Sequence, residues 1–204
     1  MAEATISAQV VKELRELTGA GMMDCKKALQ ESGGDLEKAV DWLRAKGAAK
    51  AAKRSDKSAN EGTIGSYLHF DGRTAVIVEL NCETDFVANT DAFKALAKDL
   101  ALHIASSAPL AVSPDEMDPA VVEREREVYR QQVREEGKPD KIADKIVEGK
   151  MQKFFKESAL LAQPYVKDPD KTIEQLITDV SAKTGEKIQV ARFARLKVGE
   201  RSRA

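Results

Sequence analysis

Three side chains of this sequence could form a thiol-based catalytic group, namely Cys82, His69 and Asp85. Cys82 and His69 lie in segments that are expected to pair as a hairpin, which would bring them near each other. A cysteine nucleophile requires an activated thiol, usually through a neighbouring base. Because nothing in the sequence around Cys82 indicates such activation, a thiol enzyme is an alternative that we do not prefer.

Phosphate and metal binding would each need a pattern that this sequence does not contain. A chain that bound GTP itself would need a glycine-rich GxxxxGK[ST] loop, because backbone amides must converge on the phosphates. Zinc would need several Cys or His ligands at short spacing. The chain has only Cys25, Cys82, His69 and His103, none at motif spacing. We therefore expect no nucleotide, cofactor or metal on this chain and no catalytic residue, with both cysteines reduced and packed.

Two apolar segments are better suited to binding another protein than to chemistry. Met22 and Met23 follow a glycine-containing turn and open a helix, so at least one is expected to point away from a small core. Phe86 lies on a connection between a strand and a helix, where a large aromatic ring is either covered or used by a partner. Burial of both methionines, and burial of Phe86 in the core, are the alternatives.

The composition is typical of a globular protein with a protein partner. Of the 204 residues, 42% are hydrophobic and 33% are charged, and the net charge is −1. Such a balance creates no field that would attract nucleic acid or a lipid surface. No apolar run reaches the roughly 20 residues that span a bilayer, and the amino terminus lacks a signal-peptide core. We therefore expect a cytoplasmic protein with no membrane role and no direct nucleic-acid role.

Residues 1–47 predict a small domain of three short helices. Apolar residues recur at helical spacing in each of them. These residues are Val10, Val11, Leu14 and Leu17, then Cys25, Ala28 and Leu29, then Leu36, Ala39, Val40 and Leu43. Glycines at Gly19, Gly33 and Gly47 are expected to end the helices, because glycine readily adopts the left-handed conformation found there.

Residues 48–60 predict a solvated linker, because they are rich in Ala, Lys and Ser and have no apolar stripe. Their basic residues are Lys50, Lys53, Arg54 and Lys57. This run could contact RNA, but it lacks the interleaved aromatic residues that stack on bases. A plain connector is therefore preferred, and RNA contact is the alternative.

Residues 61–204 predict an α+β core domain. Alternating apolar residues on either side of Asp71 and Gly72 predict a hairpin with a tight primed turn, in which the Asp-Gly pair supplies the positive φ values. A final strand over 187–198 would complete a three-stranded antiparallel sheet. Because the helices are segregated from these few strands, the class is α+β.

The helices of this core domain are expected in three places. The first begins at Thr90 or Asp91 and carries an apolar face. The second place is a helical hairpin with a proline-led start at 113–119, broken at 137–139 by glycine and proline. A last amphipathic helix ends near Gly185, just before the final strand.

Two long segments resemble the signature sequences of the elongation factor Ts family. They are TGAGMMDCKKAL, from Thr18 to Leu29, and VELNCETDFVA, from Val78 to Ala88. A third segment, LLAQPYVKD at 160–168, also resembles the family, and the order of the segments matches over nearly the whole chain. The resemblance implies a three-helix amino-terminal domain of the ubiquitin-associated type and a core of antiparallel sheet with helices.

The resemblance also implies a function, guanine nucleotide exchange on elongation factor Tu. Such a factor binds the GDP form, disturbs its magnesium and phosphate site, and promotes GDP release and reloading with GTP during protein synthesis. It is not an enzyme, because no covalent step is needed. A protein that binds the nucleotide-free form more tightly than the GDP form weakens GDP binding by the same factor.

Seven residues acquire partner-binding roles from the resemblance. Asp85 and Phe86 would enter elongation factor Tu near its magnesium site, with Phe86 wedged between side chains of the partner. Thr84 and Val87 would shape the turn. The residues that would grip a helix of the partner's nucleotide domain are Arg15, Met22 and Met23.

The carboxyl-terminal part has one copy of the core subdomain, where longer members of the family carry two. We therefore expect a homodimer, and a two-to-two complex with elongation factor Tu. The hairpin and the last strand are candidate dimer surfaces, because exposed strand edges invite pairing. The alternative function is a general interaction module that binds ubiquitin-like or RNA partners through the helical head and the basic linker.

Overall fold

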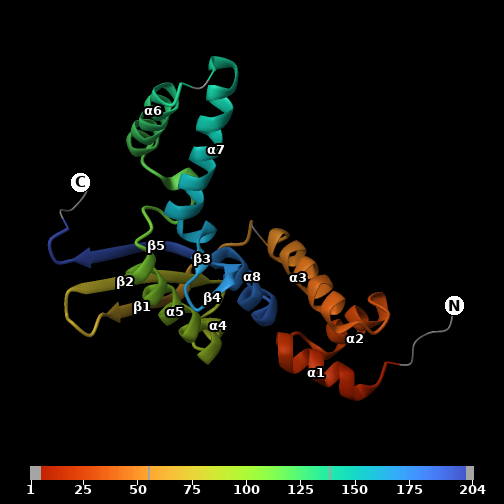
Figure 1. Cartoon of the computed structure of the whole chain (residues 1–204). Helices are drawn as coiled ribbons and strands as arrows, with labels where there is room; N and C mark the ends of the chain where they lie inside the picture. The colour runs from red at the N-terminus through yellow and green to blue at the C-terminus, as the bar shows by residue number, and fades with distance from the viewer. Residues whose placement is uncertain (1–5, 55, 138, 201–204) are drawn as a thin grey trace. The chain divides into compact units, whose positions relative to one another are not determined.

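In the computed structural model of the chain, the described residues are 6–54, 56–137 and 139–200. The helices and strands, labelled in Figure 1, are α1 (Ala8–Thr18), α2 (Met22–Glu31), α3 (Leu36–Ala52), β1 (Glu61–Leu68), β2 (Thr74–Cys82), α4 (Asp85–Ala88), α5 (Asp91–Ser107), α6 (Pro119–Glu135), α7 (Asp140–Ser158), β3 (Pro164–Tyr165), β4 (Asp168–Thr172), α8 (Ile173–Thr184) and β5 (Ile188–Lys197). Short 3-10 helices occur at Pro114–Glu116 and Leu160–Ala162. This content confirms the α+β class.

The chain forms two compact units. The first unit comprises Met1–Thr63, Asn81–Leu96 and Ile177–Gln189, and the second unit comprises Ile64–Leu80, Ala97–Leu176 and Val190–Ala204. The division of the chain into residues 1–47, 48–60 and 61–204 stays a prediction.

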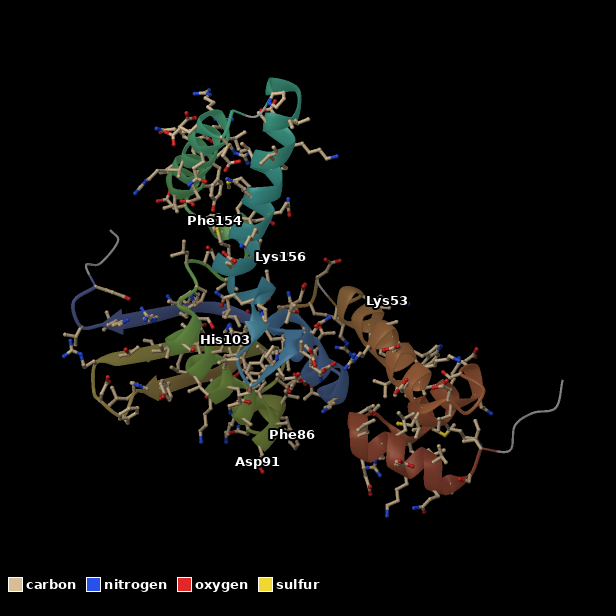
Figure 2. The ribbon with its side chains drawn as sticks, viewed as in Figure 1. Lys53, Phe86, Asp91, His103, Phe154 and Lys156 are labelled. Carbon is tan, nitrogen blue, oxygen red and sulfur yellow. The ribbon has the colours of Figure 1, made fainter. Side chains whose placement is uncertain are left out.

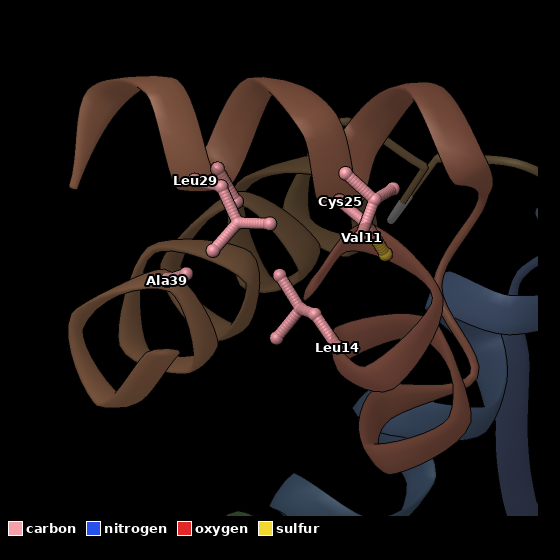
Figure 3. Close-up of a cluster of buried hydrophobic side chains, with 6 residues drawn as sticks. Val11, Leu14, Cys25, Leu29 and Ala39 are labelled. Atoms are coloured by element: carbon pink, nitrogen blue, oxygen red, sulfur yellow. The ribbon is translucent and has the colours of Figure 1, made fainter. Parts of the chain in front are cut away.

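The helices α1, α2 and α3 enclose a small core in the first unit. Ser7 starts α1, because its hydroxyl accepts a hydrogen bond from the Val10 amide at 3.3 Å, and Gly19 ends it with a φ of 68°. The buried side chains of this core, shown in Figure 3, are Val11, Leu14, Cys25, Ala28, Leu29 and Ala39. Leu17 is exposed, so its expected burial was wrong. It is rotated by about 120° from Val11 around the helix axis.

The end of α3 corrects a second expectation. Gly47 does not stop the helix, which continues to Ala52, five residues into the expected linker. Gly47 is absent from the glycines with positive φ, so it keeps an ordinary helical conformation. Two lysines of α3 bind the Asp24 carboxylate of α2, Lys46 at 2.7 Å and Lys50 at 2.9 Å. These hydrogen bonds lower the pKa of Asp24 and favour continuation of the helix.

The strands form a sheet in the order β1-β2-β5, which confirms the expected three-stranded antiparallel sheet. The hairpin of β1 and β2 is also present, but the primed turn was wrong. Gly72 has a φ of 70°, whereas Asp71 is not among the described residues with positive φ. The Gly72 amide donates to the His69 carbonyl at 2.8 Å, and the His69 amide donates to the Thr74 carbonyl at 2.8 Å. A longer connection with one left-handed glycine therefore replaces the two-residue turn.

One face of the sheet is covered by α5. A Cβ atom placed on Gly65 of β1 would lie 2.4 Å from the carbonyl oxygen of Ala97 in α5. On β5, the Arg195 Nε donates to the Ala105 carbonyl at 3.4 Å. The apolar face expected for this helix is confirmed, because all of its expected members are buried, namely Phe93, Leu96, Ala97, Leu100 and Ile104.

The helices α6 and α7 run side by side as the expected helical hairpin (Figure 1). Asp118 starts α6 by accepting a hydrogen bond from the Ala120 amide at 2.8 Å. Val133, Val147 and Met151 are buried between the two helices. Within the expected start at 113–119, Pro114–Glu116 forms only a short 3-10 helix.

A second sheet, made of β3 and β4 in antiparallel pairing, was not predicted. Its strands are too short to show an alternating pattern.

His103 of α5 is buried next to this second sheet. Its Nδ1 accepts a hydrogen bond from the Val166 amide at 3.3 Å, and its Nε2 lies 2.9 Å from Gln163 Oε1. The backbone N–H of Val166 can only donate, so Nδ1 is the acceptor and Nε2 carries the proton. Burial lowers the pKa of His103, so this neutral ring serves structure.

Candidate partner-binding site

Phe86 lies on α4, a single helical turn that follows β2 (Figure 2). Thr84 starts this turn from an extended backbone, and its hydroxyl accepts a hydrogen bond from the Val87 amide at 3.4 Å. At the other end, the Asn89 side chain donates to the Asp85 carbonyl at 3.0 Å. Caps at both ends therefore determine the backbone from which Phe86 projects.

The four side chains of α4 are divided between solvent and core. The Phe86 ring is 85% exposed and Asp85 is exposed, whereas Val87 and Ala88 are buried. The buried pair anchors the turn and leaves the aromatic ring outside. An aromatic ring exposed on a fixed backbone is suited to a protein interface. The alternative in which Phe86 belongs to the core is therefore wrong.

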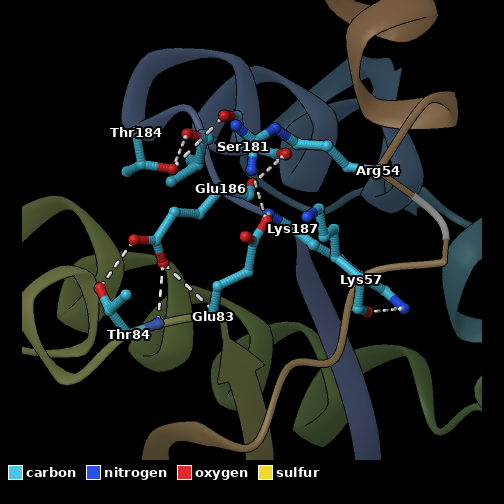
Figure 4. A network of polar contacts seen from close by, with 9 residues as sticks. Arg54, Lys57, Glu83, Thr84, Ser181, Thr184, Glu186 and Lys187 are labelled. Carbon is cyan, nitrogen blue, oxygen red and sulfur yellow. Dashed lines mark hydrogen bonds and ion pairs between the residues drawn. The ribbon is translucent and has the colours of Figure 1, made fainter.

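Two glutamates hold the connection between β2 and α4 (Figure 4). The Glu186 carboxylate, between α8 and β5, accepts hydrogen bonds from the amides of Glu83 and Thr84 at 3.1 and 3.0 Å, and from the Thr84 hydroxyl at 2.7 Å. In return, the Glu83 carboxylate accepts from the Lys187 amide and from Arg54 Nη1, both at 2.7 Å. These two donors lower the pKa of Glu83.

Sequence reasoning missed the part that Glu186 plays in the site. Glu186 lies 102 positions from Thr84 along the chain, and no local spacing relates the two residues. The one signal in the sequence was Glu83, which belongs to the VELNCETDFVA segment. Only the folded chain places a second carboxylate beside it.

The methionine pair opens α2 and faces solvent. Met22 is 47% exposed and Met23 is 74% exposed, so the alternative with both buried is wrong. Arg15 is exposed on the neighbouring helix α1. Gly21 precedes the pair and contributes no side chain to cover it. The structure thus presents all three residues, while their roles in binding a partner stay predictions.

The structure argues against Cys82 as a catalytic nucleophile. The Cys82 thiol is buried and donates to the Thr84 carbonyl at 3.1 Å. Burial raises the pKa of Cys82, which opposes formation of a nucleophilic thiolate. The His69 Nδ1, the base in that interpretation, forms a hydrogen bond of 2.9 Å with the Tyr67 hydroxyl.

The basic linker is also partly committed to contacts within the chain. Lys50 binds Asp24, and Arg54 binds Glu83.

Within the described ranges, no cluster of three or more His, Cys, Asp or Glu side chains could hold a metal ion. Over the same residues, every helix is too short or too polar to cross a bilayer.

The fold and the site define a class, an α+β protein that presents an aromatic turn and a methionine-bearing helix on its surface. The family model for elongation factor Ts matches residues 4–200. The chain belongs to the elongation factor Ts family, a family of translation elongation factors.

Similar relatives cover nearly the full length of this chain. Elongation factor Ts of Nitratidesulfovibrio vulgaris is 58% identical over 194 residues, which are 95% of this chain and 97% of the relative. That of Desulfosudis oleivorans is 56% identical over 196 residues, with 96% and 99% covered. That of Thermoanaerobacter pseudethanolicus is 54% identical over 195 residues, with 96% of each chain covered.

Proposed function

We propose that this chain is a guanine nucleotide exchange factor for elongation factor Tu, acting in the cytoplasm during protein synthesis. The observation that carries the proposal is the 85% exposure of Phe86 on a turn with a cap at each end. Aromatic residues that fill a partner's pocket contribute a large part of the binding energy at protein interfaces. Membership of the elongation factor Ts family supports the identity of that partner.

The mechanism follows from linkage and needs no covalent step. Phe86 enters a pocket of the partner, and the Asp85 carboxylate approaches the magnesium and phosphate site. Burial of one phenylalanine side chain contributes about 1.5–3 kcal/mol. If that burial occurs only when GDP is absent, it weakens GDP binding by about tenfold to hundredfold. Incoming GTP reverses the displacement through the same coupling.

The amino-terminal head contributes docking energy. Arg15, Met22 and Met23 bind a helix of the partner's nucleotide domain, and the flexible thioethers of the methionines adapt to its surface. Because the head and the Phe86 turn belong to one chain, binding of the first raises the effective concentration of the second.

Release of a fluorescent GDP analogue from elongation factor Tu, measured by stopped-flow fluorescence, tests the proposal. We expect the chain to accelerate release in a saturable manner, since exchange requires a complex. The competing interpretation, a general interaction module, predicts binding to RNA or ubiquitin-like proteins with GDP release unchanged. Absence of acceleration at every concentration of the chain would refute the exchange function.

We further propose that two copies associate through the sheet face opposite α5. A Cβ atom added to Gly65 and the side chain of Arg195 both point toward α5. Because side chains alternate along a strand, the residues next to these two point away from α5. Val76 and Val78 of β2 are buried, so Ile77, which lies between them, is on the open face. The apolar residues of this open face, 54% to 74% exposed, are Ile64, Leu68, Ile77 and Leu196.

A second copy of the chain is the occupant that best fits this open face. The same face carries an ion pair of 2.7 Å between Glu79 and Arg192, so both signs of charge are present. Under two-fold symmetry, such a surface can meet itself without like-charge repulsion. The association would give a homodimer and, with elongation factor Tu, a two-to-two complex.

Light scattering tests the dimer directly. The wild-type chain is expected to have twice the 22.3 kDa chain mass, and Ile77→Glu is expected to have the monomer mass, because it places an unpaired charge in the apolar contact. Val128→Glu, at an exposed position of α6, is the matched control and should remain dimeric. A monomeric wild type, or a dimeric Ile77→Glu, would rule out this interface.

A further inference from the structure

The Glu186 carboxylate supports the turn that carries Phe86 without being adjacent to it in sequence. It accepts the two amides of Glu83 and Thr84 as well as the Thr84 hydroxyl, all within 3.1 Å (Figure 4). Hydrogen bonds to an ionised carboxylate are stronger than those between neutral groups. One side chain therefore satisfies the backbone donors that immediately precede α4.

The Thr84 hydroxyl transmits this support to α4. A hydroxyl has one hydrogen and two lone pairs. Because Glu186 takes the hydrogen at 2.7 Å, a lone pair of the oxygen is left for the Val87 amide at 3.4 Å. Without the carboxylate, the hydroxyl could rotate to other partners. Glu186 thus selects the rotamer of the Thr84 side chain and the direction of its hydroxyl proton, which allow Thr84 to cap the start of α4.

Hydrogen bonds of the surrounding backbone hold Glu186 in place. Its backbone carbonyl accepts a hydrogen bond from the Ser181 hydroxyl of α8. The next residue, Lys187, donates its amide to the Glu83 carboxylate at 2.7 Å. The β2–α4 connection and the α8–β5 connection therefore each supply a carboxylate that accepts from the backbone of the other, and these hydrogen bonds hold the two connections together.

The Phe86 ring depends on this arrangement, because its 85% exposure leaves it little support from its own chain. Its direction is set by the backbone of α4. We infer that Glu186 is a positioning residue for nucleotide exchange, which holds α4 so that the ring is oriented before the partner is met. This inference rests on the exchange function proposed above. Pre-orientation removes the cost of ordering the turn from the step that follows docking of the head, in which the ring enters its pocket and GDP is released.

Glu186→Gln tests the inference, because it keeps the size of the side chain but removes the charge and one acceptor atom. We expect GDP release at a saturating concentration of the chain to slow about tenfold. The half-saturating concentration should change little, because the contacts of the head are retained. Glu174→Gln, at an exposed glutamate of the preceding helix α8, is the matched control and should release GDP at the wild-type rate.

A double-mutant cycle with Phe86→Ala separates positioning from a general loss of stability. If Glu186 acts through the ring, Glu186→Gln will have no further effect on GDP release once the ring is absent. A general loss of stability would slow release by the same factor in both backgrounds. Equal factors, or wild-type release by Glu186→Gln, would overturn the inference.

Amide hydrogen exchange of the chain alone gives a measurement that does not involve elongation factor Tu. In Glu186→Gln, peptides covering 83–89 should exchange about tenfold faster, while peptides of α5 should be unchanged. A wild-type chain that fails to accelerate GDP release overturns the proposed function. Normal wild-type acceleration together with unchanged protection of 83–89 overturns the role of Glu186 alone.

Discussion

Phe86→Ala will slow GDP release from elongation factor Tu by about 30-fold or more at a saturating concentration of the chain. Truncation of an aromatic residue at the centre of an interface costs about 2 kcal/mol or more, which corresponds to this factor. The ring is 85% exposed, so its burial is available only to the partner. Stopped-flow fluorescence of a labelled GDP measures the rate, and urea unfolding should show a change in stability within about 0.5 kcal/mol.

Phe70→Ala is the matched control for this experiment. The Phe70 ring is even more exposed, on the connection between β1 and β2, and the proposed mechanism gives it no contact with the nucleotide site. We expect this variant to release GDP at the wild-type rate. Met22→Ala and Met23→Ala should slow GDP release less than Phe86→Ala does. Normal release by Phe86→Ala would remove Phe86 from the mechanism.

Gly65→Ala is expected to destabilise the core by about 3 kcal/mol, because it overfills the contact between β1 and α5. The added Cβ would lie 2.4 Å from the carbonyl oxygen and 2.7 Å from the carbonyl carbon of Ala97. Both atoms belong to the backbone of α5, so no flexible side chain can move aside, and the strand must separate from the helix. Urea unfolding followed by circular dichroism measures the loss.

Gly149→Ala provides the comparison for the same chemical change without the clash. An added Cβ at Gly149 of α7 meets no atom within 4 Å, and alanine is the better helix former by about 1 kcal/mol. This variant should therefore be at least as stable as the wild type. A Gly65→Ala protein with an unchanged midpoint would show that the backbones of β1 and α5 are not in close contact at Gly65.

The local features of the candidate site were predictable from the sequence, but their exposure was not. A strand exit followed by a helix was evident around Phe86, and an Ala-Gly turn before a helix was evident at Met22 and Met23. For both, burial and exposure remained open, because a side chain on a connection can face either way. The structure decided for exposure in each case. Val87, one residue along, is buried.

Errors in the predicted fold arose where one residue type permits two conformations. Gly47 can end a helix or remain inside it, and the bonds from Lys46 and Lys50 to Asp24 favour the second outcome. Asp71 and Gly72 were expected to form a primed turn, but only Gly72 adopts a positive φ. The helix α5, predicted from a long apolar pattern, was confirmed, because many apolar residues contribute to such a pattern. The hairpin of α6 and α7, predicted from its proline-led start and the break at 137–139, was also confirmed.

Periodicity and contiguous motifs were enough to predict the α+β class, the order of the long helices and of strands β1, β2 and β5, and membership of the elongation factor Ts family. They did not predict the short strands β3 and β4. The tertiary structure alone decided that Glu186 supports the turn of Phe86, that His103 is buried, and that an apolar sheet face stays open. Each of these depends on which distant segments meet. Local spacing carries no information about contacts between residues 102 positions apart, such as Thr84 and Glu186.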